Sequence, residues 1–139
     1  MGRLVELQTP PRSDHLALVR LVVEGAVRLG GALPDGRVDD LRLAVSEACT
    51  NALDAQHVAG SDEPIVIRVE LGDDEVAVTV TDHAGGFEVD EVEPAPAATD
   101  PSRLRHEHGL GIPLMRSLVD EVTFTPTLGG TAVRLVARA

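Results

Sequence analysis

Two neighbouring segments of strictly alternating apolar residues constrain the fold of this chain more than any other feature. Residues 65–71 and 75–82 each place an aliphatic side chain at every second position, and Gly72-Asp73-Asp74 separates them. Side chains alternate between the two faces of a strand, so this pattern predicts a hairpin with one buried face. Such a hairpin is stable only when another layer of structure covers its apolar face.

Three segments with helical spacing supply that covering layer. The first helix is expected to begin at a cap formed by Ser13 or Asp14, and the second at a cap formed by Asp35. A third helix is expected from about Ile112, where Pro113 fits the first turn. The remaining strands are expected at residues 3–8, 121–126 and 131–138. Helices and an antiparallel sheet in this order predict an α+β fold, a two-layer sandwich with the helices on one face of the sheet.

The composition is typical of one compact domain, which we expect to span residues 1–139. Hydrophobic residues make up 43% of the chain but aromatic residues only 1%, so the core must be aliphatic. The scarcity of aromatic rings and a net charge of −11 argue against a nucleic-acid binder, which needs stacking platforms and a basic face. An acidic chain is better suited to a basic protein partner.

Lysine is missing from the sequence, and all twelve basic residues are arginine. This excludes mechanisms that depend on a lysine, such as a P-loop, a protein-kinase β3 lysine or a Schiff base. The only cysteine, Cys49, rules out an internal disulfide, and we expect it to be a small core residue instead of a nucleophile. The sequence contains neither a secretory leader nor a membrane span, which predicts a cytoplasmic protein.

Residues 83–108 interrupt the regular pattern. They contain three prolines among alanines and acidic residues, followed by Arg103 and Arg105, and they show no periodicity. A structureless stretch of this length inside a compact domain is often a functional lid. We therefore expect 83–108 to form a lid or loop over a ligand.

The first of three short patches that could bind a ligand lies in the second predicted helix. Glu47 and Asn51 are four residues apart and share a helix face. The Asn51 amide oxygen is a hard ligand suited to magnesium, and Glu47 can deprotonate a nucleophile beside the metal. The alternative is that both are solvated residues on an outer face. Small neighbours such as Ala48 and Ala52 weaken that alternative, because they leave room for a ligand.

The second patch is Asp82, which ends an apolar strand and is followed by Gly85-Gly86. A carboxylate there can accept a hydrogen bond from an amino group such as the adenine N6, and glycines let a ligand approach the backbone. An ordinary turn is the alternative interpretation. The third patch, Gly109-Leu110-Gly111, opens the last helix, where backbone N–H groups favour a phosphate. Plain turns also contain such glycine pairs.

In this order the patches resemble the N, G1 and G2 boxes of the GHKL, or Bergerat-fold, ATPase superfamily. Within it, the chain is similar to the small serine-protein kinase anti-sigma factors through Glu47-Ala-Cys-Thr-Asn51, residues 109–122 and Gly130-Thr131. The resemblance covers nearly the whole chain. Two positions depart from it, because Ala84 replaces the first glycine of the G1 box and Asp54 stands where many relatives have histidine.

The resemblance implies a role for each matching residue. Glu47 would be the catalytic base and Asn51 a magnesium ligand. Asp82 would bind the adenine amino group, with support from Thr131. The nucleotide pocket and its lid would also include Gly86, Arg105, Gly109, Leu110 and Gly111. The implied cofactors are ATP and Mg²⁺.

The implied function is that of an ATP-dependent serine-protein kinase that doubles as an anti-sigma factor. Such proteins bind an RNA polymerase sigma factor and phosphorylate a STAS-domain antagonist. A homodimer is expected through the first helix or the strand near Val5, whose apolar edge would otherwise be exposed. Direct contact with nucleic acid or a membrane is not expected. The alternative is a non-catalytic module of the same fold that only sequesters a partner.

Overall fold

The computed structural model of the chain describes residues 2–85 and 111–139. The strands are β1 (Arg3–Thr9), β2 (Ile65–Leu71), β3 (Glu75–Thr81), β4 (Glu121–Pro126) and β5 (Thr131–Arg138). The helices are α1 (Leu16–Gly30), which follows a 3-10 turn at Ser13–His15, α2 (Asp35–Ala59) and α4 (Gly111–Leu118). The predicted hairpins and helices are confirmed. No helix in these two ranges combines the length and the apolarity that a membrane span requires.

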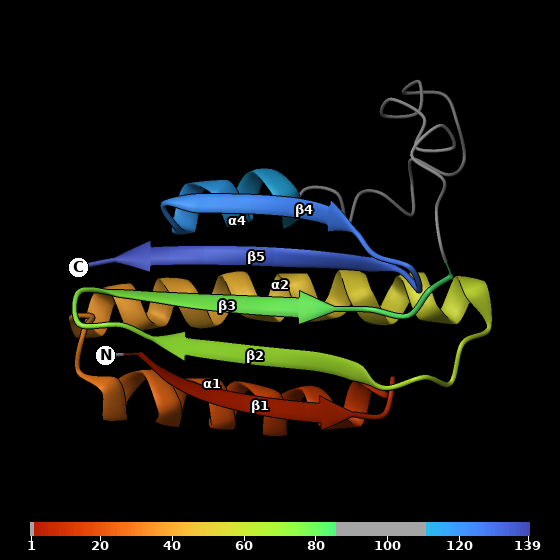
Figure 1. Ribbon diagram of the computed structural model, residues 1–139, viewed down its shortest axis with the longest axis horizontal. Coiled ribbons are helices and arrows are strands. Elements are labelled where there is room, and N and C mark those ends of the chain that lie inside the picture. Colours follow the sequence, from red (N-terminus) through yellow and green to blue (C-terminus); the bar gives the residue numbers. More distant parts are fainter. Residues whose placement is uncertain (1, 86–110) are drawn as a thin grey trace.

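Across the described residues the strands form one antiparallel sheet in the order β1-β2-β3-β5-β4. The helices α1, α2 and α4 all lie on the same face of this sheet, and the long α2 runs behind its centre (Figure 1). The opposite face carries no helix from the described part of the chain (Figure 1). This arrangement is the predicted two-layer α+β sandwich.

The core lies between the sheet and the helices and is aliphatic, as the composition requires. The register brings Val78 of β3 opposite Val69 of β2 on one side and Leu135 of β5 on the other. These three residues and the helix residues Val23 and Leu41 belong to one buried cluster. Full burial of a side chain of this kind contributes about 1.5–3 kcal/mol. The alternating strands therefore determine which face the helices cover.

The start of α2 differs from the prediction. Asp35 is the first residue of the helix instead of its cap, and the N-cap is Pro34, which has no side-chain cap hydrogen bond. The Pro34 carbonyl accepts hydrogen bonds from the N–H groups of Arg37 and Val38, at 2.9 and 3.0 Å. The Asp35 carboxylate is 2.8 Å from the guanidinium of Arg28. The prediction was wrong because this ion pair engages the carboxylate outside the helix.

The start of α1 also corrects the prediction. Ser13 and Asp14 lie in the 3-10 turn, and α1 has no side-chain cap. Asp14 is 2.8 Å from the guanidinium of Arg12 instead. The helices α1 and α2 are each followed by a glycine, Gly31 and Gly60, with φ angles of 72° and 67°. Glycine adopts this left-handed conformation without strain.

One side chain joins the ends of three elements. The Arg37 guanidinium on α2 donates to the carbonyl of Leu118, the last residue of α4, at 3.0 Å and to the Asp120 carboxylate at 2.6 Å. Asp120 in turn accepts a hydrogen bond from the N–H of Arg138, at the end of β5, at 2.7 Å. Arg37 therefore anchors the C-terminus of α4 between α2 and the sheet.

Candidate functional site

Strand β3 is followed directly by a carboxylate that the backbone holds in one orientation. Asp82 is only 7% exposed. Its Oδ1 accepts hydrogen bonds from the N–H of Ala84, at 3.1 Å, and from the N–H of Thr131, at 3.3 Å. The Asp82 N–H donates to the Thr131 carbonyl at 3.0 Å. The fold thus brings the predicted pair Asp82 and Thr131 together, and no described residue binds the second carboxylate oxygen, Oδ2.

Gly130 makes this close approach possible. A Cβ at position 130 would clash with both the carbonyl oxygen and the Oδ1 of Asp82. Only glycine therefore lets the turn between β4 and β5 come near enough for Thr131 to bind Oδ1. Sequence reasoning missed this role. The signal was Gly130-Thr131, which we used as part of the resemblance without inferring a close contact between Gly130 and Asp82.

Burial raises the pKa of the Asp82 carboxyl, and the hydrogen bonds from Ala84 and Thr131 offset only part of that effect. A carboxylate in such a poorly solvated position is a strong acceptor for an N–H group of a ligand. The two backbone bonds do not themselves require a charge, because an amide oxygen would accept them too. The site is therefore suited to an amino donor such as the exocyclic amine of a purine base.

Residues 82–85, which we name the 82–85 turn, each donate a backbone N–H to an acceptor. The Asp82 N–H donates to the Thr131 carbonyl at 3.0 Å, and the His83 N–H donates to the Gln56 side chain at 2.8 Å. The Ala84 N–H donates to the Asp82 carboxylate at 3.1 Å, and the Gly85 N–H donates to the Gly129 carbonyl at 2.9 Å. Helix α2 and the β4–β5 turn both contribute, so segments far apart in the sequence determine the conformation of this turn.

Gln56, on α2, is fully buried and supplies one of these acceptors. Its Nε2 donates to the Glu63 carbonyl at 2.6 Å. The His83 ring is also held, because its Nδ1 lies 2.6 Å from the carbonyl of Pro64, which can only accept. Sequence reasoning missed Gln56. The signal was its position four residues after Ala52, on the apolar face of the helix, where a polar side chain needs partners.

The predicted helix-face pair lies on the same helix. Glu47 and Asn51 are both half-buried, and they share a face because they are one helical turn apart. Gln56 connects this helix to the 82–85 turn. Their small neighbours Ala48 and Ala52 are both buried in the core.

Cys49 is a buried core residue, as predicted. Burial raises the pKa of its thiol to about 12, so the thiol stays protonated and unreactive near neutral pH. The described residues also hold no cluster of three or more His, Cys, Asp or Glu side chains suited to a metal ion.

Comparison with known proteins places this geometry in a family. The sequence profile described as "Histidine kinase-like ATPase domain" matches residues 9–137. The chain belongs to this family. It is 32% identical to serine-protein kinase RsbW of Bacillus pumilus, over 92% of this chain and 82% of that protein. It is 34% identical to serine-protein kinase RsbW of Bacillus velezensis, over 91% of this chain and 81% of that protein. The resemblance drawn from the sequence boxes is confirmed.

A crystal structure of the RsbU and RsbW domains of a Mycobacterium tuberculosis protein, Rv1364c, has the same fold. It matches this chain with a TM-score of 0.70 and 21% identity. The match covers 98% of this chain and 32% of that longer chain. At this identity the likeness concerns the fold alone, and it agrees with the histidine kinase-like ATPase architecture.

Several predicted site residues of this histidine kinase-like ATPase lie outside the described residues. They are Gly86, Arg105, Gly109 and Leu110, together with residues 86–108 of the predicted lid. Gly111 is the first residue of α4. Within the described residues only glycines have a positive φ, so Ala84 has an ordinary backbone conformation while Gly85 has a φ of 91°. Alanine thus replaces the first glycine of the G1 box where the freedom of glycine is not needed.

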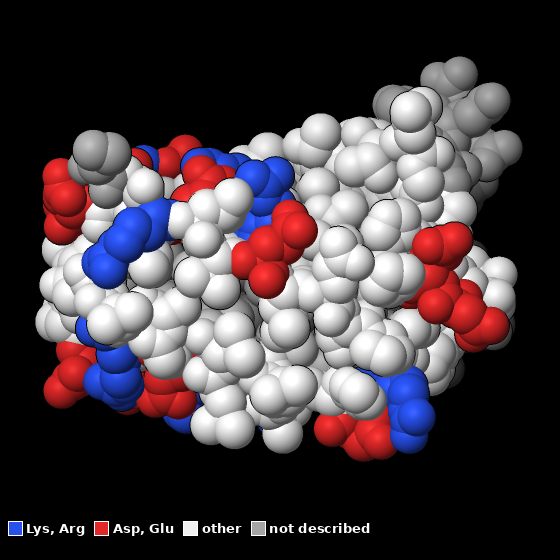
Figure 2. Space-filling view, turned by 60° about the horizontal axis from the view of Figure 1, so that its bottom comes forward, with Lys and Arg blue, Asp and Glu red and all other residues white. Residues whose placement is uncertain are grey.

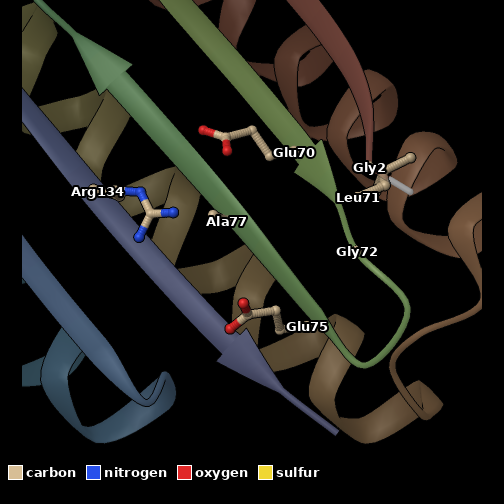
Figure 3. A pocket seen from close by; sticks show the side chains of 7 residues that line it. All are labelled: Gly2, Glu70, Leu71, Gly72, Glu75, Ala77 and Arg134. Carbon is tan, nitrogen blue, oxygen red and sulfur yellow. The ribbon is translucent and has the colours of Figure 1, made fainter.

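The open face of the sheet carries a separate hollow (Figure 3). It measures about 140 Å³ and is lined by Gly2, Glu70, Leu71, Gly72, Glu75, Ala77 and Arg134. Figure 3 shows Glu70 and Glu75 near the small Ala77, with Arg134 on the neighbouring strand β5. The hollow lies at the β2–β3 turn, at the opposite end of β3 from Asp82. It is therefore separate from the candidate ATPase site.

Proposed function

We propose that this chain is an anti-sigma factor with serine-protein kinase activity, which sequesters an RNA polymerase sigma factor and phosphorylates a STAS-domain antagonist in the cytoplasm. The similarity to serine-protein kinase RsbW supports this class of reaction. The observation that carries the proposal is the Asp82 carboxylate, whose Oδ1 is bound by the backbone while no described residue binds Oδ2.

Asp82 would select the base. Its Oδ2 accepts a hydrogen bond from the 6-amino group of adenine, and the Thr131 N–H holds the carboxylate in place. Guanine presents a carbonyl oxygen at the same position, which a carboxylate repels. The site is therefore expected to prefer ATP to GTP.

Phosphoryl transfer would depend on α2. Asn51 holds Mg²⁺ through its amide oxygen, and the metal, when bound, neutralises charge on the transferred phosphoryl group. Glu47, one helical turn before Asn51, accepts the proton of the attacking serine hydroxyl of the antagonist. The serine oxygen forms its bond to the γ-phosphorus while the bond from that phosphorus to the leaving ADP oxygen breaks.

Transfer of labelled γ-phosphate from ATP to a cognate STAS-domain protein tests the proposal. Glu47→Ala is expected to lower the transfer rate by about 10²–10⁴-fold. It should retain Mg-ATP binding, because Glu47 does not hold the nucleotide. Asn51→Ala is expected to weaken Mg-ATP binding as well as transfer. Glu70→Ala, which removes an exposed carboxylate from the open face of the sheet, is the control and should react at the wild-type rate.

Two outcomes would contradict this proposal. A wild-type chain that binds its STAS-domain partner tightly but transfers no phosphate would favour the alternative, a non-catalytic module that only sequesters. A Glu47→Ala variant that transfers phosphate at the wild-type rate would show that Glu47 is not the base.

A homodimer through α1 and β1 belongs to the same proposal. β1 is an edge strand, and Leu18, Leu21 and Leu29 of α1 are 50%, 68% and 75% exposed. Figure 2 brings this side of the molecule forward and shows areas of uncharged side chains between groups of charged residues. An apolar surface beside an open strand edge is suited to a second copy of the chain.

A further inference from the structure

We infer that Gln56 is a positioning residue for Asp82 and that it controls how strongly the chain prefers ATP to nucleotides without the 6-amino group. The inference rests on the proposed role of Asp82 in binding adenine. A buried residue of α2, bonded to the 82–85 turn, would thus affect which base the site selects.

Gln56 is bonded to the 82–85 turn at the residue that follows Asp82. Its Oε1 accepts the hydrogen bond of the His83 N–H at 2.8 Å. That N–H belongs to the peptide group that joins Asp82 to His83. Because a peptide group is planar, holding its N–H also holds the Cα of Asp82, from which the carboxylate projects. A displacement of Gln56 therefore changes the direction in which Asp82 presents Oδ2.

The Gln56 amide has one orientation, because its two ends have different partners. Its Nε2 donates to the Glu63 carbonyl at 2.6 Å, while its Oε1 faces an N–H donor. Exchanging the two groups would set an oxygen against a carbonyl and an NH₂ against an N–H, and both contacts would be repulsive. The side chain has 0% exposure, so water does not replace these partners. Gln56 is therefore a rigid spacer between α2 and the turn.

Gln56 belongs to the same helix as the proposed magnesium ligand. Asn51, the proposed magnesium ligand, lies on the same α2, five residues earlier. Through Gln56, α2 is bonded directly to the residue that follows Asp82. The side chain therefore relates the position of the base contact to that of the metal ligand, which a nucleotide must satisfy at the same time.

A purely structural role would have a different signature. A buried amide that only satisfies neighbouring polar groups would lower stability when removed, and it would weaken every nucleotide equally. A positioning role changes the affinity of a nucleotide that uses Asp82 and spares one that does not. Selectivity, and not affinity alone, is thus the decisive quantity.

The test compares ATP with purine riboside triphosphate, which lacks only the 6-amino group, by titration calorimetry of the full chain with Mg²⁺. Gln56→Met keeps the length of the side chain but removes both of its hydrogen bonds. We expect it to reduce the preference for ATP by about tenfold or more, with little change in the affinity for the analogue. Val38→Ala, a buried change near the start of α2, is the control. It should lower the melting temperature and keep the wild-type preference.

Asp82→Asn separates this inference from the proposed function. If Asp82 binds the 6-amino group, Asp82→Asn loses the preference for ATP, and adding Gln56→Met to it changes the preference no further. A wild-type chain without the preference, or an Asp82→Asn variant that keeps it, would overturn the role of Asp82 itself. A Gln56→Met variant with the wild-type preference, beside an Asp82→Asn variant without it, would overturn the role of Gln56 alone.

Gln56→Ser provides a second variant should Gln56→Met not fold. The serine side chain is too short to reach the His83 N–H. It leaves space for a water molecule that can donate a hydrogen bond to the Glu63 carbonyl. We expect a folded protein, as judged by circular dichroism, with a reduced preference for ATP. A folded Gln56→Ser variant with the wild-type preference would contradict the inference.

Discussion

At the scale of single residues, Asp82 holds a negative charge where burial disfavours it. Its pKa is raised in the folded protein because burial outweighs the hydrogen bonds from Ala84 and Thr131. A raised pKa means that folding favours the protonated form of Asp82. The stability that the protonated carboxyl contributes is fully present below the unfolded-state pKa of about 3.9, and it is lost as the pH rises through the folded-state pKa. At neutral pH the charged carboxylate therefore lowers the stability of the ligand-free protein, as expected for a group whose charge is used in binding.

Asp82→Asn is accordingly expected to melt at the same temperature as the wild type or higher at neutral pH, because an amide oxygen can keep both backbone hydrogen bonds. Scanning calorimetry measures this. ATP affinity should fall at the same time, and in the wild type it should decline on acidification at a higher pH than an ordinary aspartate would cause. Asp74→Asn, which changes an exposed carboxylate in the β2–β3 turn, is the control. A clearly lower melting temperature for Asp82→Asn would contradict this account.

Gly130→Ala tests the close approach of the β4–β5 turn to the carboxylate. The added methyl group would clash with Asp82, so we expect a loss of about 1–3 kcal/mol of stability in urea unfolding, as for other overpacked sites. Gly129→Ala is a matched control, because its Cβ would meet only the His83 ring, at 3.4 Å. Equal stability of the two variants would show that the turn has room to move.

The site residues differ in how far sequence predicts them. The pairing of Asp82 with Thr131 was predictable from the family resemblance, whereas the role of the pair in binding a nucleotide stays a prediction. Gln56 and Gly130 were not predictable, since each acquires its role only when α2 or the β4–β5 turn packs against the 82–85 turn. A tertiary contact of this kind leaves no local pattern in the sequence. The roles of Glu47 and Asn51 stay predictions.

At the scale of elements, periodicity predicted the strands and helices closely, because one apolar face must be buried. The bounds of β4 and β5 agree with the predicted segments 121–126 and 131–138. The helix starts were less predictable. Asp35 is of a residue type favoured at helix N-caps, but Arg28, in the preceding helix, binds its carboxylate in the folded protein. A local preference worth about 1 kcal/mol is easily overridden by such a contact.

Arg37→Ala is the corresponding prediction for an element. It removes the donor to the Leu118 carbonyl and the partner of Asp120, so the end of α4 should fray. We expect a loss of about 1–2 kcal/mol and faster amide exchange at the end of α4. Arg42→Ala, which removes only surface ion pairs with Glu24 and Asp39, is the control and should change stability by less than about 0.5 kcal/mol. Unchanged exchange in α4 would contradict the anchoring role.

The same cluster has a pH signature. The N–H of Arg138 and the charge of Arg37 hold the pKa of Asp120 below its usual value. A lowered pKa contributes stability that is present above the unfolded-state pKa of about 3.9 and is lost as the pH falls through the folded-state pKa. Arg37→Ala should therefore lose less stability on acidification than the wild type, although the Arg138 bond retains part of the effect.

At the scale of the whole molecule, self-association through α1 and β1 is the measurable expectation. Leu21→Arg places a charge in the apolar surface of α1 and should give a monomer in sedimentation experiments at concentrations where the wild type is a dimer. Leu128→Arg is the matched control, because Leu128 is fully exposed on the β4–β5 turn, outside that surface. A wild-type chain that sediments as a monomer at high micromolar concentration would exclude the dimer.

The bonding of the 82–85 turn also has a consequence for the order of folding. Its partners come from Gln56, Pro64 and the segment 129–131, so the turn cannot assume its final form until α2, the start of β2 and the β4–β5 turn have come together. Contacts between such distant segments form slowly and late. A partly folded intermediate would hold its hairpins and helices yet fail to recognise adenine. Nucleotide binding would then report completed folding, and a newly made chain would become responsive to ATP only at the last step.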